Sequence, residues 1–136
     1  GHQGIAEAMG ISVIPLELVD DYFYHLDTCF CPLSPTEAIY YPGAFDEYGR
    51  KVLRQSIPEL IEVEPDEERQ FACNAVVIDK NIITSTGCPR LHTRLRERGW
   101  SPREADLGEF LKAGGSAKCL TLRLDGEDAA SWNDPS

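Results

Sequence analysis

Ala38-Ile39-Tyr40-Tyr41 is the stretch that decides the fold, because a similar apolar stretch, Ile82-Ile83-Thr84-Ser85, follows 44 positions later. Short apolar runs that are rich in β-branched and aromatic residues and bounded by turn residues predict strands. Apolar residues at helical spacing predict a helix over 45–56 after the first stretch, and a second helix is predicted over 89–98 after the second. Strand and helix signals that recur at a fixed interval indicate a repeat architecture.

The remaining elements complete the same unit twice. A strand is expected before each quoted stretch, over 25–33 and 75–78, and another after each helix, over 60–63 and 102–106. The unit is therefore strand, strand, helix, strand (ββαβ), and consecutive units are expected to cover each other's apolar faces. Two units would not close a ring, so we expect an α/β protein that forms part of a radial or stacked array. The other expected elements are the end of a helix over 5–10, strands over 11–18 and 117–124, and helical turns over 64–70 and 107–112.

Length and composition limit the class of protein. The chain has 136 residues, of which 42% are hydrophobic, so residues 1–136 are expected to form one globular domain with a flexible polar tail over 126–136. No apolar run approaches the ~18 residues of a membrane-spanning helix, and the first residues lack the basic region and cleavage site of a signal peptide. The net charge of −10 disfavours nucleic acid and anionic membranes and favours cationic small molecules. Five cysteines without a secretory signal indicate reduced thiols in a cytoplasmic protein.

The first candidate site lies in Tyr24-His25-Leu26-Asp27-Thr28-Cys29-Phe30. Side chains alternate between the two faces of a strand, so the strand predicted over 25–33 would present His25, Asp27, Cys29 and Cys31 on one face. An imidazole beside a carboxylate suits proton transfer and the binding of a cation. The alternative is a surface pair at the end of a strand.

The second candidate site is Gly114-Gly115-Ser116-Ala117-Lys118-Cys119. A pair of glycines lets the backbone turn sharply and lets a ligand approach closely. A thiolate is a strong nucleophile, and a nearby histidine can carry its proton. From spacing alone Cys119 is therefore either a nucleophile at the edge of a strand or a buried, inert cysteine.

Together these two motifs resemble those of the guanidino-group-modifying enzymes, which include arginine deiminases, dimethylarginine dimethylaminohydrolases and arginine:glycine amidinotransferases. The resemblance covers roughly residues 11–124, and Phe71-Ala72-Cys73-Asn74-Ala75 is similar to the family's asparagine-bearing segment. It implies that Cys119 attacks the guanidinium carbon, that His25 is the acid and base, and that Asp27 and Asn74 bind the substrate. The implied substrate is arginine or another guanidino compound, and the implied reaction needs no metal or cofactor.

The resemblance also implies a fold, a pseudo-fivefold α/β propeller of ββαβ blades, of which this chain would supply about half of the ring. The family's domain is considerably longer than this chain, and its N-terminal half carries a further acidic substrate-binding motif that nothing before His25 resembles. We therefore expect a C-terminal fragment, or a propeller that a second copy or another chain completes, because open sheet edges invite pairing. Hydrolase and transferase chemistry both remain open. The alternative is an incomplete propeller that acts as a protein interaction module.

Two other kinds of site are less consistent with the sequence. Cys29, Cys31, Cys88 and His92 could in principle form a zinc site, but their spacing is not that of paired zinc knuckles, so no metal is expected. The arginines of the helix over 89–98 lack aromatic partners for base stacking, which indicates a solvated helix face and not a nucleic-acid site.

Overall fold

Two three-stranded sheets of the same topology form the centre of the molecule. The computed structural model describes residues 1–122. In the first sheet β1 (Phe30–Ser34) pairs antiparallel with β2 (Glu37–Tyr40), which pairs parallel with β3 (Glu59–Glu62). In the second sheet β4 (Val76–Ile78), β5 (Asn81–Ser85) and β6 (Ser101–Ala105) follow the same order and the same directions. The predicted pair of ββαβ units is confirmed.

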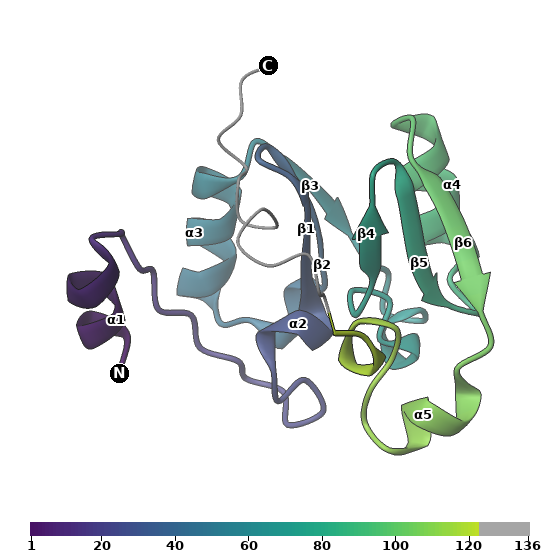
Figure 1. Cartoon of the computed structure of the whole chain (residues 1–136), viewed down its shortest axis with the longest axis horizontal. Coiled ribbons are helices and arrows are strands. Elements are labelled where there is room, and N and C mark those ends of the chain that lie inside the picture. Colours follow the sequence, from purple (N-terminus) through teal and green to yellow (C-terminus); the bar gives the residue numbers. More distant parts are fainter. Residues whose placement is uncertain (123–136) are drawn as a thin grey trace.

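A helix makes the parallel crossover in each unit, as a parallel pair of strands requires. Helix α3 (Glu47–Ser56) connects β2 to β3, and α4 (Pro89–Glu97) connects β5 to β6. The Asp46 side chain accepts a hydrogen bond from the Gly49 N–H at 2.7 Å, so the residue before α3 supplies its N-terminal cap. Figure 1 shows the two sheets side by side, and the strand β4 lies between β1 and β5 in that view.

The second unit covers the first through its helix. Leu91 and Leu95 of α4 belong to the same buried apolar cluster as Ile61 of β3 and Val63, which follows it. Polar contacts at the edge of this junction keep the two units in register: Arg94 of α4 donates to the Glu62 carbonyl at 2.6 Å and pairs with the Glu64 carboxylate. The expectation that each unit covers the apolar face of its neighbour is confirmed for this pair.

The N-terminal segment packs on the first unit without forming a strand. Helix α1 (His2–Met9) ends at Gly10, whose φ of 63° is the left-handed conformation that favours glycine, as the sequence predicted. The strand predicted over 11–18 is wrong: only one isolated bridge, Leu18 to Phe45, links the segment to the first unit. Its apolar residues Leu16 and Leu18 pack against a second buried cluster that contains Phe45. Side-chain burial, and not a ladder of backbone hydrogen bonds, fixes this segment.

Two further predicted strands are wrong where the candidate site lies. Residues 26–29 form one helical turn, α2 (Leu26–Cys29), and only then does the chain extend into β1. The turn forms because the Thr28 hydroxyl and N–H both donate to the His25 carbonyl, at 2.6 and 3.0 Å. The strand predicted over 117–124 is a 3₁₀ turn, η3 (Lys118–Leu120), in its described part, and its last residues lie outside the described range. The tail predicted over 126–136 also lies outside that range.

The remaining elements are short and connect the units. The helical turns that the sequence predicted after residues 64 and 107 are present. They are η2 (Glu68–Gln70) and α5 (Gly108–Lys112). A further short turn, η1 (Pro42–Ala44), precedes α3. Within residues 1–122, no helix combines the length and the apolar character needed to cross a membrane.

Candidate active site

Three segments that are far apart in the sequence meet at one end of the two sheets. Asp27 lies in α2, Asn74 lies in the turn before β4, and Cys119 lies in η3. Figure 1 shows α2 and the yellow segment that carries η3 next to each other at that end of the strands. Hydrogen-bonding contacts thus bring together three of the four residues predicted from the sequence, and His25 is the fourth.

The thiol of Cys119 lies against the carboxylate of Asp27. The Sγ atom of Cys119 is 3.8 Å from Oδ2 of Asp27, although 92 positions separate the two residues. Oδ1 of Asp27 is buried and has no hydrogen-bond partner among the described residues. A buried carboxylate oxygen without a partner is costly in the free protein. The site therefore holds a thiol and an unsatisfied acceptor side by side.

Asn74 lies beneath this pair and is completely buried. Its Nδ2 donates to the Asp27 carbonyl at 3.0 Å, and its Oδ1 accepts from the N–H groups of Ser116 and Cys119 at 3.0 and 3.1 Å. Phe71, at φ 47°, makes the left-handed turn that leads into this residue, and the Asn74 N–H donates to the Phe71 carbonyl at 2.8 Å. Three of the four hydrogen-bonding positions of the Asn74 amide are thus taken up by backbone groups, and the direct contact with a substrate that the resemblance implies stays a prediction.

His25 is exposed and lies at the entrance to α2. Its ring packs against the ring of Tyr24, with 4.7 Å between the centroids. Among the described residues no hydrogen bond joins the His25 imidazole to Cys119 or Asp27. The α2 turn holds the backbone of His25 through its carbonyl, which accepts from Thr28, whereas the imidazole lies at the surface.

Tyr24 is a site residue that sequence reasoning missed. Its hydroxyl donates to the Gly114 carbonyl at 2.5 Å, so the residue before His25 is tied to the loop that precedes Cys119. Gly114 has φ 86°, and a Cβ atom at this position would lie 3.0 Å from the Tyr24 hydroxyl. The glycine pair that the sequence indicated as a turn thus also gives Tyr24 its close approach. The only sequence signal was the position of Tyr24 beside His25, since the contact spans 90 positions.

The five cysteines differ in their access to solvent. Cys119 is exposed, whereas the other four thiols, Cys29, Cys31, Cys73 and Cys88, are buried and all five are unpaired. Burial raises the pKa of Cys29 to about 12, with a further contribution from the Asp27 carboxylate, and burial raises the pKa of Cys31 to about 11. Burial also raises the pKa of Cys73 and that of Cys88, the latter to about 12. Four of the thiols are therefore held in the unreactive protonated form.

A groove of about 780 Å³ begins beside Asp27 and runs between β1 and β4. Most of its walls are apolar, from Phe30 and Leu33 on one side to Val76 and Ile78 on the other, and the charged groups that line it are Asp27, Asp79 and Lys118. Within residues 1–122 no group of three or more His, Cys, Asp or Glu side chains could hold a metal ion. The arrangement favours an organic ligand with a cationic end at Asp27.

The sequence and the structure of this chain were compared with those of known proteins. A scan against protein-family models finds no match. The bifunctional arginine dihydrolase/ornithine cyclodeaminase ArgZ of Synechocystis is 49% identical over 90% of this chain and 18% of its own length. The dimethylarginine dimethylaminohydrolase of Mycobacterium tuberculosis is 38% identical over 90% of this chain and 41% of its own length. The product-bound N-terminal domain of ArgZ superimposes with a TM-score of 0.85, at 49% identity, over 90% of this chain and 45% of that domain.

Fold and site together define an α/β protein of ββαβ units with an exposed thiol beside a partly buried carboxylate. The chain belongs to the guanidino-group-modifying superfamily, which the sequence motifs indicated. It spans less than half the length of the curated relatives that it matches. The structures of the ArgZ domain include one bound to substrate and one bound covalently to a reaction intermediate.

Proposed function

We propose that this chain carries the nucleophilic part of an enzyme site that acts on the guanidinium group of arginine or a related compound. The observation that carries the proposal is the pair formed by the Cys119 thiol and the Asp27 carboxylate, 3.8 Å apart, with a buried Asp27 oxygen that lacks a partner. A planar guanidinium donates parallel hydrogen bonds to a carboxylate, so it would satisfy that oxygen and present its carbon to the sulfur. Relatives named for reactions of arginine and dimethylarginine support this substrate class.

The proposed chemistry uses the thiol of Cys119 and the imidazole of His25. The Cys119 thiol gives its proton to His25, the resulting thiolate forms a bond to the guanidinium carbon, and the bond from that carbon to the departing nitrogen breaks. The departing amine takes a proton from His25, which then accepts a proton from the incoming water or amine. The incoming group bonds to the same carbon, and the thiolate leaves with the electron pair of the sulfur–carbon bond. Water as the incoming group makes the protein a hydrolase, and an amine makes it an amidinotransferase.

The role of His25 requires its side chain to turn toward the thiol. The ring is exposed and packs on Tyr24, whose hydroxyl is already bonded to the loop before Cys119. We assign this movement to a change of side-chain rotamer about the fixed backbone. We therefore assign His25 as the acid and base of the proposed reaction.

The whole protein would form a pseudo-fivefold α/β propeller to which residues 1–136 contribute two of the ββαβ units as one partial domain. The open edges of the two sheets and the exposed apolar residues of the N-terminal segment, Ile5, Met9, Ile11 and Ile14, suit further units of the same chain, a second copy or a partner chain. A homo-oligomer or a completing partner chain thus remains part of the proposal. The second candidate function, an interaction module without activity, is favoured by these exposed residues but leaves the paired thiol and carboxylate without a purpose.

The test is the reaction of Cys119 with a cationic and a neutral electrophile. In 2-chloroacetamidine the methylene carbon would bond to the thiolate sulfur as chloride leaves, while the amidinium pairs with Asp27; iodoacetamide reacts at the same sulfur without a charge. We expect the ratio of the two labelling rates at Cys119, measured by peptide mapping, to fall about tenfold or more in Asp27→Asn, since a charge-assisted pair is lost. A ratio that is the same in the wild type and in Asp27→Asn would refute the proposed site and leave the interaction module.

A further inference from the structure

The amide of Asn74 connects the two halves of the candidate site to each other. All three of its partners are backbone groups: the Asp27 carbonyl and the N–H groups of Ser116 and Cys119. A backbone carbonyl can only accept and a backbone N–H can only donate, so the amide orientation is fixed by its partners. The backbone carbonyl of Asn74 adds a fourth bond, from the Lys118 N–H at 3.1 Å.

The bond to Asp27 fixes the one-turn helix that carries the carboxylate. In α2 the Leu26 carbonyl accepts from the Phe30 N–H, whereas the carbonyl groups of the last residues of a helix have no partner within it. Asn74 supplies one such partner from the turn before β4, 47 positions away, and thereby holds α2 against the second unit. The Asp27 carboxylate projects from the residue that receives this bond.

The bonds to Ser116 and Cys119 fix the loop that carries the thiol. Both N–H groups converge on a single oxygen, so the chain from 116 to 119 curls around the amide instead of extending into a strand. Gly115 permits the curl, because a Cβ atom there would lie 3.1 Å from the Cys119 Cβ. The strand predicted for this segment is absent for this reason.

We infer that Asn74 is a positioning residue whose amide sets the distance between the Cys119 thiol and the Asp27 carboxylate without touching the substrate. The inference rests on the proposed function, because it gives a role to the pair that the proposal places in contact with the guanidinium. An amide is the side chain that suits this position, since it offers both a donor and acceptor capacity. A carboxylate would lack the donor for Asp27, and an apolar side chain would leave two N–H groups and a carbonyl unpaired in a buried position.

The experiment uses the full chain and two neutral substitutions, which leave the net charge unchanged. Asn74→Leu removes all three hydrogen bonds of the amide while keeping the number and branching of the side-chain heavy atoms. If this variant fails to fold, Asn74→Ser is used, because its hydroxyl is too short to span the three partners and its smaller side chain leaves room for water. Thr84→Val is the matched control, because it removes a buried hydroxyl that bonds to His92 and Ser85 without touching the site. Circular dichroism establishes that each variant is folded. Peptide mapping then measures the labelling rates of Cys119 by 2-chloroacetamidine and by iodoacetamide.

We expect the ratio of the amidine labelling rate to the iodoacetamide labelling rate at Cys119 to fall about tenfold in the folded Asn74 variants. In Thr84→Val this ratio should stay within about twofold of the wild-type value. A purely structural role would loosen the fold and change both rates together, leaving their ratio intact. An unchanged ratio in the Asn74 variants, or an equal loss in Thr84→Val, would overturn the inference. A wild type that shows no amidine preference would instead refute the proposed function, so the two failures are distinguishable.

Discussion

Replacing Glu67 by glutamine should destabilise the fold, because this carboxylate caps helix α4 from outside. Glu67 is buried, and its two oxygens accept from the N–H groups of Arg90 and Leu91 at 2.7 and 3.0 Å. These groups belong to the first turn of α4, where Cys88, the residue before the helix, supplies no side-chain cap. The first N–H groups of a helix have no partner within it, and the helix dipole favours a negative charge there.

The magnitude follows from what the substitution removes. Glutamine keeps one acceptor oxygen and turns an amide NH₂ toward the other N–H, so one charge-assisted hydrogen bond is lost, at a cost of about 1.5–3 kcal/mol. Loss of the negative charge at the helix N-terminus costs up to about 2 kcal/mol more in a partly buried geometry. We therefore expect Glu67→Gln to lower the free energy of unfolding by about 2–4 kcal/mol, a large part of the about 5–15 kcal/mol typical of a domain.

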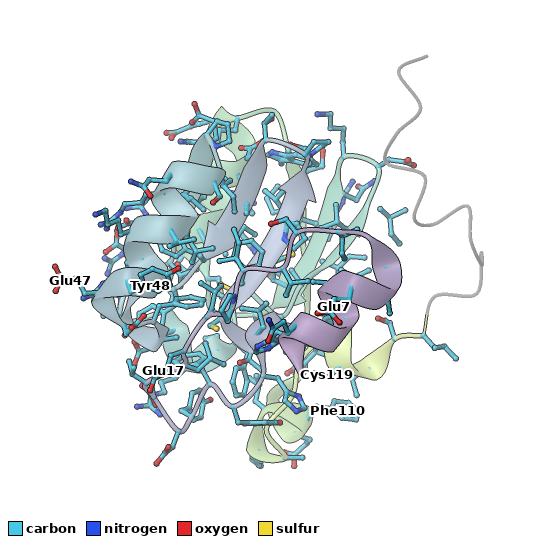
Figure 2. The ribbon with its side chains drawn as sticks, turned by 90° about the vertical axis from the view of Figure 1, so that its left-hand side faces the viewer. Glu7, Glu17, Glu47, Tyr48, Phe110 and Cys119 are labelled. Carbon is cyan, nitrogen blue, oxygen red and sulfur yellow. The ribbon has the colours of Figure 1, made fainter. Side chains whose placement is uncertain are left out.

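The assay is urea unfolding followed by circular dichroism, with Glu47→Gln as the matched control. Glu47 also lies in the first turn of a helix, α3, but it is exposed, and Figure 2 shows it at the outer edge of the molecule. The control should change the free energy of unfolding by less than about 0.5 kcal/mol. Equal effects of the two substitutions would refute the reasoning, because burial and the two hydrogen bonds would then contribute nothing beyond the charge.

Two further predictions concern the cysteines and the buried histidine. During brief exposure of the folded protein to iodoacetamide, Cys119 should be labelled first among the five cysteines, because it alone is exposed and burial raises the pKa of the other four thiols. Peptide mapping that finds Cys29 or Cys88 labelled as fast would contradict this. Burial lowers the pKa of His92, and the positive charge of Arg96 lowers it further. Glu104, whose carboxylate is 3.2 Å from the His92 ring, and Glu67 raise this pKa, but burial outweighs them. The unfolded chain then binds a proton that the folded chain does not, so the free energy of unfolding should fall as pH drops below about 6.5, and the fall should be smaller in His92→Gln; identical pH profiles in urea unfolding would rule this out.

The repeat was predictable because its signals are local. The period of apolar residues, the proline at the start of α4 and the glycine after it depend only on neighbours in the chain, and β2, α3, β3, β4, β5, α4 and β6 all lie within a few residues of the predicted ranges. The motifs around His25 and Cys119 indicated the family on the same basis, since they are contiguous in the sequence.

What the sequence could not show depends on contacts between distant segments. The stretch from His25 to Cys31 alternates like a strand, yet Thr28 bonds to the His25 carbonyl in a helical turn, and Asn74 holds that turn in place by its bond to the Asp27 carbonyl across 47 positions. The same amide curls the segment at Cys119 across 45 positions, and Glu67 caps α4 from 24 positions away. A single buried polar group can override a local propensity worth a few tenths of a kcal/mol, because leaving it unpaired costs about 1–3 kcal/mol. The sequence by itself determined the two ββαβ units and indicated candidate residues of the site, and the tertiary structure decided how Asp27, Asn74 and Cys119 face one another.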